Sequence, residues 1–311
     1  MLKYVIKSVF SFCLIVTMII SACNNEKVTF SGETAFRYLE QQCELGVRSP
    51  GSIGHDEALV MYTDFLKQHA DTLFHQNFEA YIEPENVTLD LTNIIAGFNW
   101  DKGNGLLIGA HWDTRPRADR DPNPEFRDTP ILGANDGASG IAVLMHLAEI
   151  LAISEPDRAV TLVFFDGEDY GYSGGLDYYC MGSEYFSKNL PIPKPAEGII
   201  IDMIGDAELS IPVERYSYNY HPELVRRIWD IAKELGYSEF VLHLEDYIHD
   251  DHIPLNQIAG IPTIDIIDFY YPNTYSNYWH TVNDTPDKCS PKSLEIVGNV
   301  LVKYIFSNPG K

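Results

Sequence analysis

Residues 161–171 have the sequence T-L-V-F-F-D-G-E-D-Y-G, in which an apolar run leads directly into a group of acidic residues. Such runs are typical of strands that are buried on both faces of a sheet. The acidic residues are Asp166, Glu168 and Asp169, and they follow the run where open α/β sheets place their ligands. The alternative is a solvated acidic loop, since charged residues mostly face water. The rest of the chain decides between these interpretations.

Other segments predict further strands and the helices between them. The predicted strands occupy residues 72–82, 87–98, 106–110, 160–165, 198–204, 240–244 and 262–267. Apolar residues at helical spacing predict helices at residues 33–45, 55–69, 141–151, 182–188, 222–235 and 290–306. The first two strands are expected to form an antiparallel pair. Alternation of strands and helices predicts an α/β fold, with a single-domain mixed β-sheet flanked by helices on both faces.

The charge of the chain limits its partners. It has 22 Lys and Arg against 45 Asp and Glu, a formal net charge of −23 over 311 residues. A charge of this sign repels phosphate backbones and anionic membrane surfaces, so no nucleic acid is expected to bind. The acidic surface is interpreted as a solubility feature.

The first residues resemble a bacterial lipoprotein signal. Lys3 and Lys7 precede an apolar segment at residues 9–20, and Ser21-Ala22-Cys23 supplies a small-residue cleavage site. The alternative, an uncleaved membrane anchor, is disfavoured because the apolar segment is shorter than the roughly 20 residues that span a bilayer. We expect residues 1–22 to be a signal peptide, Cys23 to carry the lipid and residues 23–33 to form a tether. The protein would then be an exported monomer at a bacterial membrane, facing the periplasm or cell exterior, that touches the membrane only through this anchor.

Three cysteines remain outside the predicted signal, at Cys43, Cys180 and Cys289. Their spacing matches neither a zinc finger nor a redox pair, and an odd number does not pair completely. We expect buried thiols, and the sequence leaves one disulfide open, as an exported protein permits.

Five positions lie at or just after the end of a predicted strand, or begin the helix that follows one. They are His111, Asp136, the pair Glu168 and Asp169, Asp202, and His280. Histidine with aspartate and glutamate is the ligand mixture of a catalytic zinc site. Loops at one edge of a sheet bring such residues together although they are far apart in the sequence. The five positions together therefore predict a metal centre.

Each position also has a structural interpretation of its own. His111 and Asp113 form an H-x-D pair that is as often a structural hydrogen bond as part of a metal site. Asp136 alone would be interpreted as the N-cap of the next helix. Asp202 interrupts the apolar run I-I-I-D-M-I and must be paired or bound to metal, because burial of a lone charge is costly. His280 alone would be a packed core histidine.

The order of these motifs resembles the M28-type zinc aminopeptidase superfamily and, within it, the glutaminyl-peptide cyclotransferases. The motifs are H-x-D, N-D-G-A-S-G, F-F-D-G-E-D, a strand aspartate and W-H-T. The closer resemblance depends on residues 48–52 (R-S-P-G-S), 164–168, 201–205 and 249–254 (H-D-D-H-I-P) and on W-H-T at 279–281. It covers residues from about 35 to 306, so residues 34–311 are expected to be a zinc-dependent catalytic domain.

The resemblance implies a role for each matching residue. Asp136, Asp169 and His280 would bind one zinc ion, with Asp169 where the animal enzymes have glutamate. Glu168 would be the acid/base, and Asp202 and Asp250 a hydrogen-bonded pair beside the substrate. The substrate pocket would include Trp279, Ile248 and His249, while a pocket tryptophan of the animal enzymes has no clear counterpart. Candidates for its place are Tyr170, Tyr172, Tyr178 and Tyr179, and Asp166 would be structural.

The implied activity is that of an acyltransferase that converts N-terminal glutamine of peptides or proteins to pyroglutamate with release of ammonia. Zinc would polarise the γ-amide carbonyl, and Glu168 would carry the proton from the α-amine to the leaving ammonia. The first alternative is a two-zinc aminopeptidase, in which His111 and Asp202 complete a second site and Asp136 bridges. The second is a non-catalytic binding lipoprotein. The presence of Asp250 and Trp279 favours the cyclotransferase.

Overall fold

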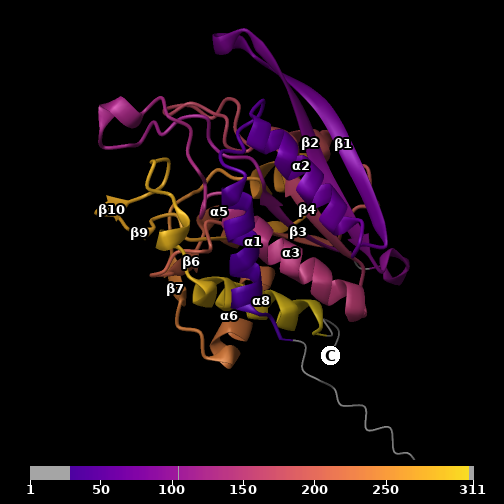
Figure 1. The fold of residues 1–311 in the computed structure, drawn as a ribbon. Coiled ribbons are helices and arrows are strands. Elements are labelled where there is room, and N and C mark those ends of the chain that lie inside the picture. Colours follow the sequence, from indigo (N-terminus) through magenta and orange to yellow (C-terminus); the bar gives the residue numbers. More distant parts are fainter. Residues whose placement is uncertain (1–28, 104, 308–311) are drawn as a thin grey trace, which may run out of the picture.

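The computed structural model describes residues 29–103 and 105–307, and the predicted signal peptide and Cys23 lie outside them. A six-stranded sheet forms the centre, and Figure 1 labels β1 to β4 of it. The order of its strands is β1-β2-β4-β3-β5-β8. Its strands are β1 (Thr72–Ile82), β2 (Val87–Phe98), β3 (Leu106–His111), β4 (Val160–Phe165), β5 (Glu197–Asp202) and β8 (Thr263–Ile267). β1, β2 and β4 pair antiparallel, whereas β4, β3, β5 and β8 are parallel. The predicted mixed sheet is therefore confirmed.

The central strands are buried on both faces, as their uninterrupted apolar sequences predict. Ile108 and Ile199 belong to the core cluster on one face, while the neighbouring Leu107 and Ile200 belong to the cluster on the other. This alternation follows from the two-residue period of a strand.

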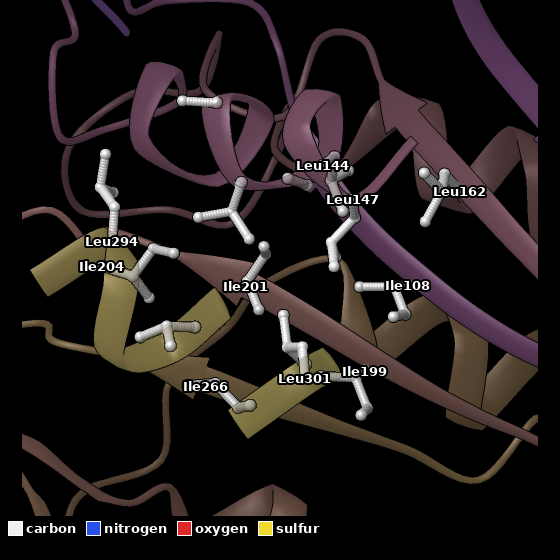
Figure 2. Close-up of a cluster of buried hydrophobic side chains, with 14 of the residues drawn as sticks. Ile108, Leu144, Leu147, Leu162, Ile199, Ile201, Ile204, Ile266, Leu294 and Leu301 are labelled. Carbon is white, nitrogen blue, oxygen red and sulfur yellow. The ribbon is translucent and has the colours of Figure 1, made fainter. Parts of the chain in front are cut away.

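Five helices form the larger core with one face of the sheet. They are α1 (Gly32–Glu44), α2 (Ile53–Leu66), α3 (Ala138–Ile153), α6 (Pro222–Leu235) and α8 (Pro291–Ile305). α1, α3 and α8 contact one another, and α6 contacts α8. Figure 2 shows Leu147 of α3 and Leu301 of α8 in one cluster with Ile201 and Ile266 of the strands.

The opposite face is covered by shorter helices. α4 (Met181–Lys188) contributes Phe186, and the π-helical segment Leu255–Ala259 contributes Leu255. The single turn α7 (His252–Pro254) leads into that segment. Helices thus lie on both faces, as expected for the α/β class. Short 3₁₀ turns lie at Glu83–Glu85, Trp100–Lys102, Pro124–Phe126 and Pro286–Lys288.

Two parts of the chain differ from the sequence-based expectations. β7 (Phe240–Leu244) lies outside the central sheet and pairs with β6 (Ile211–Val213), which the sequence did not predict. Four of the five β7 residues are exposed, so the strand does not form core. α5 (Arg215–Tyr220) was also not predicted, because its polar and tyrosine-rich sequence lacks an apolar stripe. β9 (Pro272–Asn273) and β10 (Ser276–Asn277) form a minimal hairpin.

Cys43, Cys180 and Cys289 are free thiols in the structure, and the latter two are buried. The helices in the described part of the chain include none with the length and apolar character needed to span a bilayer.

Candidate metal centre

Asp136, Asp169 and His280 meet at the carboxyl edge of the parallel strands. Asp136 precedes α3, Asp169 follows β4 and His280 follows the β9–β10 hairpin that comes after β8. One potential ligand atom from each lies within 4.8 Å of the others, and all three residues are buried. The Nε2 atom of His280 is 3.1 Å from Oδ1 of Asp169 and 3.6 Å from Oδ2 of Asp136. The structure therefore brings together the three residues predicted to bind zinc.

Unpartnered atoms in this group fit a bound cation. Oδ2 of Asp136 and Oδ2 of Asp169 are buried without a hydrogen-bond donor among the described residues. A buried carboxylate oxygen without a donor is costly, and a positive ion removes that cost. Two carboxylates and one imidazole form a donor set that zinc uses in catalytic sites and that leaves a coordination position open. The residues fit a zinc ion.

Neighbouring side chains hold the two carboxylates in place. Nη1 of Arg115 is 2.7 Å from Oδ1 of Asp169. Asp284 accepts hydrogen bonds from the backbone N–H groups of Asn135 and Asp136, at 2.8 and 3.1 Å. Such supporting contacts orient metal ligands.

Asp113 fixes the loop that follows β4. Its two carboxylate oxygens accept hydrogen bonds from the backbone N–H groups of Glu168 and Asp169, at 3.0 and 3.2 Å. Its Oδ1 atom is also 3.5 Å from Nδ1 of His111. Asp113 thus positions two site residues through their backbone.

Gly137 allows the backbone next to Asp136 to approach His111 and Asp113 closely. Its φ is +100°, and a Cβ atom there would lie 2.7 Å from the carbonyl oxygen of Asp113 and 3.2 Å from Cε1 of His111. Gly137 itself occupies the N-cap of α3, so the alternative that Asp136 is the cap is wrong.

His111 lies between two carboxylates. Its Nε2 atom is 3.2 Å from Oδ1 of Asp136 and 3.2 Å from Oδ1 of Asp202. Burial lowers the pKa of His111, but hydrogen bonds with Asp113, Asp136 and Asp202 outweigh that effect and raise the pKa well above its usual value. His111, Asp136 and Asp202 thus suit a protonated imidazole between two carboxylates. The same three residues also have the composition of a second metal site.

Glu168 lies beside the three predicted ligands and is buried. Burial raises its pKa well above the usual value, and the charges of Asp169 and Asp250 add to this, while His111 opposes it. A divalent cation at the site would lower the pKa of Glu168. The thiol of Cys180 donates a hydrogen bond to Oε1 of Glu168, with a distance of 3.3 Å from Sγ.

The predicted hydrogen bond between Asp202 and Asp250 is not found among the described residues. Asp202 contacts His111 instead, at the end of β5. Oδ1 of Asp250 accepts a hydrogen bond of 2.5 Å from the backbone N–H of the next residue, Asp251. Both carboxylates nevertheless line the same cavity.

A buried group behind Asp250 was missed by the sequence analysis. Nε2 of His252 is 3.3 Å from Oε2 of Glu214, and Nδ1 of His252 is 3.8 Å from Oδ2 of Asp265. Burial raises the pKa of Asp265 well above its usual value, and the charge of Asp250 adds to this. The position of Asp265 in the apolar run P-T-I-D-I-I was a usable signal, of the kind that identified Asp202.

A cavity of about 50 Å³ opens onto these residues. Its lining includes Asp136, Glu168, Asp169, Asp202, Asp250 and His280. Trp279, Ile248 and His249 also line it, together with Tyr179 and Phe269.

Tyr179 is thus the tyrosine at the cavity wall. The hydroxyls of Tyr170 and Tyr172 instead donate to Glu85, and that of Tyr178 accepts from the N–H of Glu83 at 3.3 Å.

Asp166 has a structural environment. It is fully buried, lies 2.9 Å from Nε2 of His55 and accepts a hydrogen bond of 2.7 Å from the backbone N–H of Thr92. It therefore connects α2 to β2.

The chain is similar to known proteins in sequence and in fold. The model of peptidase family M28 matches residues 93–305. The bovine glutaminyl-peptide cyclotransferase is 24% identical over 253 residues, which are 69% of this chain and 65% of that protein. The chain therefore spans just under two thirds of this curated relative.

Solved structures from Bacteroides thetaiotaomicron are similar over most of the chain. A glutaminyl cyclase bound to N-acetylhistamine is 31% identical, with a TM-score of 0.85 over 90% of this chain and 99% of that chain. A leucine aminopeptidase precursor is also 31% identical, with a TM-score of 0.85 over 90% of this chain and 98% of that one. The chain is thus similar to proteins described by two different activities.

Proposed function

The chain belongs to peptidase family M28, and from that premise we propose that it is a zinc-dependent glutaminyl-peptide cyclotransferase. It converts the N-terminal glutamine of peptides or proteins to pyroglutamate and releases ammonia. The observation that carries the proposal is that Glu168, Asp250 and Trp279 line one cavity with the three candidate zinc ligands. The similarity to glutaminyl cyclases supports it further.

The reaction needs a group that moves a proton within the substrate. The α-nitrogen of glutamine forms a bond to the side-chain amide carbon, and the bond from that carbon to the amide nitrogen breaks. Glu168 accepts the proton from the α-amine and delivers it to the departing nitrogen, which leaves as ammonia. Proton transfer by a positioned side chain typically accelerates a reaction by about 10²–10⁴-fold. The nucleophile belongs to the substrate, so the chain supplies none.

Asp136, Asp169 and His280 would hold one zinc ion, which would supply a Lewis acid for the amide carbonyl oxygen. The surrounding side chains position the substrate. Tyr179, Phe269 and Trp279 offer rings that pack against the glutamine stem and hold it in a folded conformer.

A two-zinc aminopeptidase is the second candidate, and one observation favours it. His111, Asp136 and Asp202 form a further buried group of metal-ligand type that shares Asp136 with the first. The similarity to a leucine aminopeptidase precursor points the same way.

Three measurements on the purified protein distinguish the candidates. We expect one zinc per chain, ammonia release from a peptide that begins with glutamine and no amine release from a leucine anilide. Two zinc ions per chain with anilide cleavage and no ammonia release would contradict the cyclotransferase and support the aminopeptidase. Zinc binding without either activity would support a binding protein.

A further inference from the structure

The loop between β3 and α3 contacts two of the candidate zinc ligands. Arg115 in this loop is fully buried and pairs with Asp169. Four residues later, Asp119 faces His280, and its Oδ1 atom lies 3.8 Å from Nδ1 of the imidazole. Asp119 does not line the catalytic cavity. It therefore approaches the candidate ligands without being in reach of the reacting groups.

Arg115 fixes the orientation of the Asp119 carboxylate. Nε and Nη2 of Arg115 donate hydrogen bonds to the two carboxylate oxygens of Asp119, each at 2.8 Å. The hydroxyl of Ser173 donates a third hydrogen bond, of 2.6 Å. A two-point contact between a guanidinium and a carboxylate sets the plane of the acid as well as its distance. Asp119 is thus held in one orientation although its side chain is 17% exposed.

Further contacts hold the same loop against the segment around His280. The backbone N–H of Arg120 donates to the carbonyl oxygen of His280, at 3.2 Å. Oδ2 of Asp121 accepts a hydrogen bond of 3.2 Å from the backbone N–H of Val282. The φ of His280 is +56°, a left-handed conformation that residues other than glycine adopt only where their surroundings hold them. The position of Asp119 relative to the imidazole is therefore set by contacts on both sides.

The two ring nitrogens of His280 have different surroundings. Nε2 faces Asp169 and Asp136, the other candidate ligands. Nδ1 is buried without a hydrogen-bond partner among the described residues, and the carboxylate of Asp119 lies beside it. At 3.8 Å this contact is electrostatic, because a hydrogen bond is shorter. A negative charge beside Nδ1 favours the imidazole proton on that nitrogen, which leaves the lone pair of Nε2 for a metal ion.

We propose that Asp119 is a positioning residue for the metal centre, which holds the proton of His280 on Nδ1 and so directs Nε2 toward the ion. Arg115 extends this effect to a second ligand, because its Nη1 atom donates to Asp169 while Nε and Nη2 donate to Asp119. One guanidinium thus couples two candidate ligands from outside the cavity. The inference concerns metal affinity, so it applies to a cyclotransferase and to an aminopeptidase alike.

The test measures the zinc affinity of the full chain. Asp119→Asn keeps the size of the side chain and removes its charge, and Asp119→Ala removes the carboxylate altogether. Competition with a chromophoric chelator gives the Kd for zinc. We expect the Kd to rise by about 10-fold to 100-fold, the range typical of contacts that orient metal ligands. Asp128→Asn is the matched control, because Asp128 is exposed in the same loop, and its Kd should equal that of the native chain.

A second readout separates positioning from a role in folding. Circular dichroism of each metal-free variant shows whether the chain is folded before zinc is added. The visible spectrum of the cobalt-loaded chain reports the geometry of the ligands and does not depend on the stability of the fold. We expect this spectrum to change in Asp119→Asn and to remain native in Asp128→Asn. If Asp119→Ala fails to fold without metal, Asp119→Asn decides the outcome.

The outcomes also separate this inference from the metal centre itself. A native Kd for zinc and a native cobalt spectrum in Asp119→Asn would overturn the role of Asp119 and leave the metal centre intact. Reduced stability of the metal-free variant with an unchanged Kd would assign Asp119 to the fold alone. A native chain that binds no zinc would overturn the metal centre, and the role of Asp119 with it.

Discussion

Sγ of Cys180 lies 3.3 Å from Oε1 of Glu168, so a buried thiol donates a hydrogen bond to the proposed acid/base. Burial raises the pKa of Cys180 well above its usual value, and the charge of Glu168 adds to this, so the thiol keeps its proton. The thiol therefore helps to orient the carboxylate beside the candidate zinc ligands.

Replacement of this thiol should affect turnover without affecting zinc binding. Cys180→Ala removes the hydrogen bond, and we expect kcat to fall roughly fivefold, as the loss of a hydrogen bond of about 1 kcal/mol implies. Cys180→Ser restores a donor and should recover most of the activity. Steady-state ammonia release gives kcat for both variants. Equal losses of kcat in Cys180→Ala and Cys180→Ser would indicate that Cys180 acts through its packing and not through its hydrogen bond.

Glu168→Gln should retain zinc and lose nearly all turnover. The amide keeps the shape of the side chain but does not accept and return a proton, so we expect kcat to fall by about 10²–10⁴-fold. Glu155→Gln is the control, because Glu155 is exposed beyond the end of α3. Near-normal ammonia release from Glu168→Gln would remove this residue from its role.

Zinc content should distinguish the roles of the two buried histidines at the site. With one zinc ion, His280→Ala should abolish metal binding, whereas His111→Asn should leave one zinc per chain. Metal analysis after dialysis gives both values. A native chain with two zinc ions that loses one in His111→Asn would place His111 in a second metal site.

Glu197, at the start of β5, should stabilise the fold in a pH-dependent manner. It forms ion pairs with Arg158 at 2.9 Å and Arg227 at 2.6 Å and accepts a hydrogen bond from Tyr304. Burial raises the pKa of Glu197, but hydrogen bonds from His221, Tyr304 and Arg227 and the charge of Arg158 outweigh burial and lower the pKa well below its usual value. Glu197→Gln removes the negative charge that faces Arg158 and Arg227 and should cost about 3 kcal/mol of unfolding free energy at pH 7.

The pH dependence follows from the lowered pKa. The stabilisation is fully present above the pKa of the unfolded chain, about 4.3, and is lost as the pH falls toward the folded pKa. The difference in unfolding free energy between the native chain and Glu197→Gln, from urea titrations, should therefore shrink below about pH 4. The control is Glu223→Gln, whose exposed ion pair with Arg226 should add little at any pH. A difference that persists unchanged in acid would contradict the assignment.

Sequence patterns predicted the parts of this protein that depend on long apolar runs. β4 was predicted with its bounds, because a strand buried along its whole length has an apolar sequence. The acidic residues that follow it lie at the carboxyl end of the strand, beside the end of β3. Asp202 was recognised from its place in a strand. Asp265 has the same signal in β8, but it belongs to none of the recognised motifs.

Other features were outside the reach of sequence patterns because they depend on packing. α5 is too short and too polar to show a helical stripe. The contacts of Cys180 with Glu168 and of His252 with Glu214 join segments that only the folded chain brings together. The contact of Asp202 with His111 is of the same kind, because it joins the end of β5 to the end of β3.

Asp136, Asp169 and His280 come from three separate connections of the sheet. An ion bound to all three would act as a reversible cross-link between distant segments. Like a disulfide, it would close long loops of the chain. In the unfolded chain these ligands are scattered, so the ion would bind only the folded state and would raise its stability with concentration by mass action. A chelator should thus act on this protein as a denaturant as well as an inhibitor.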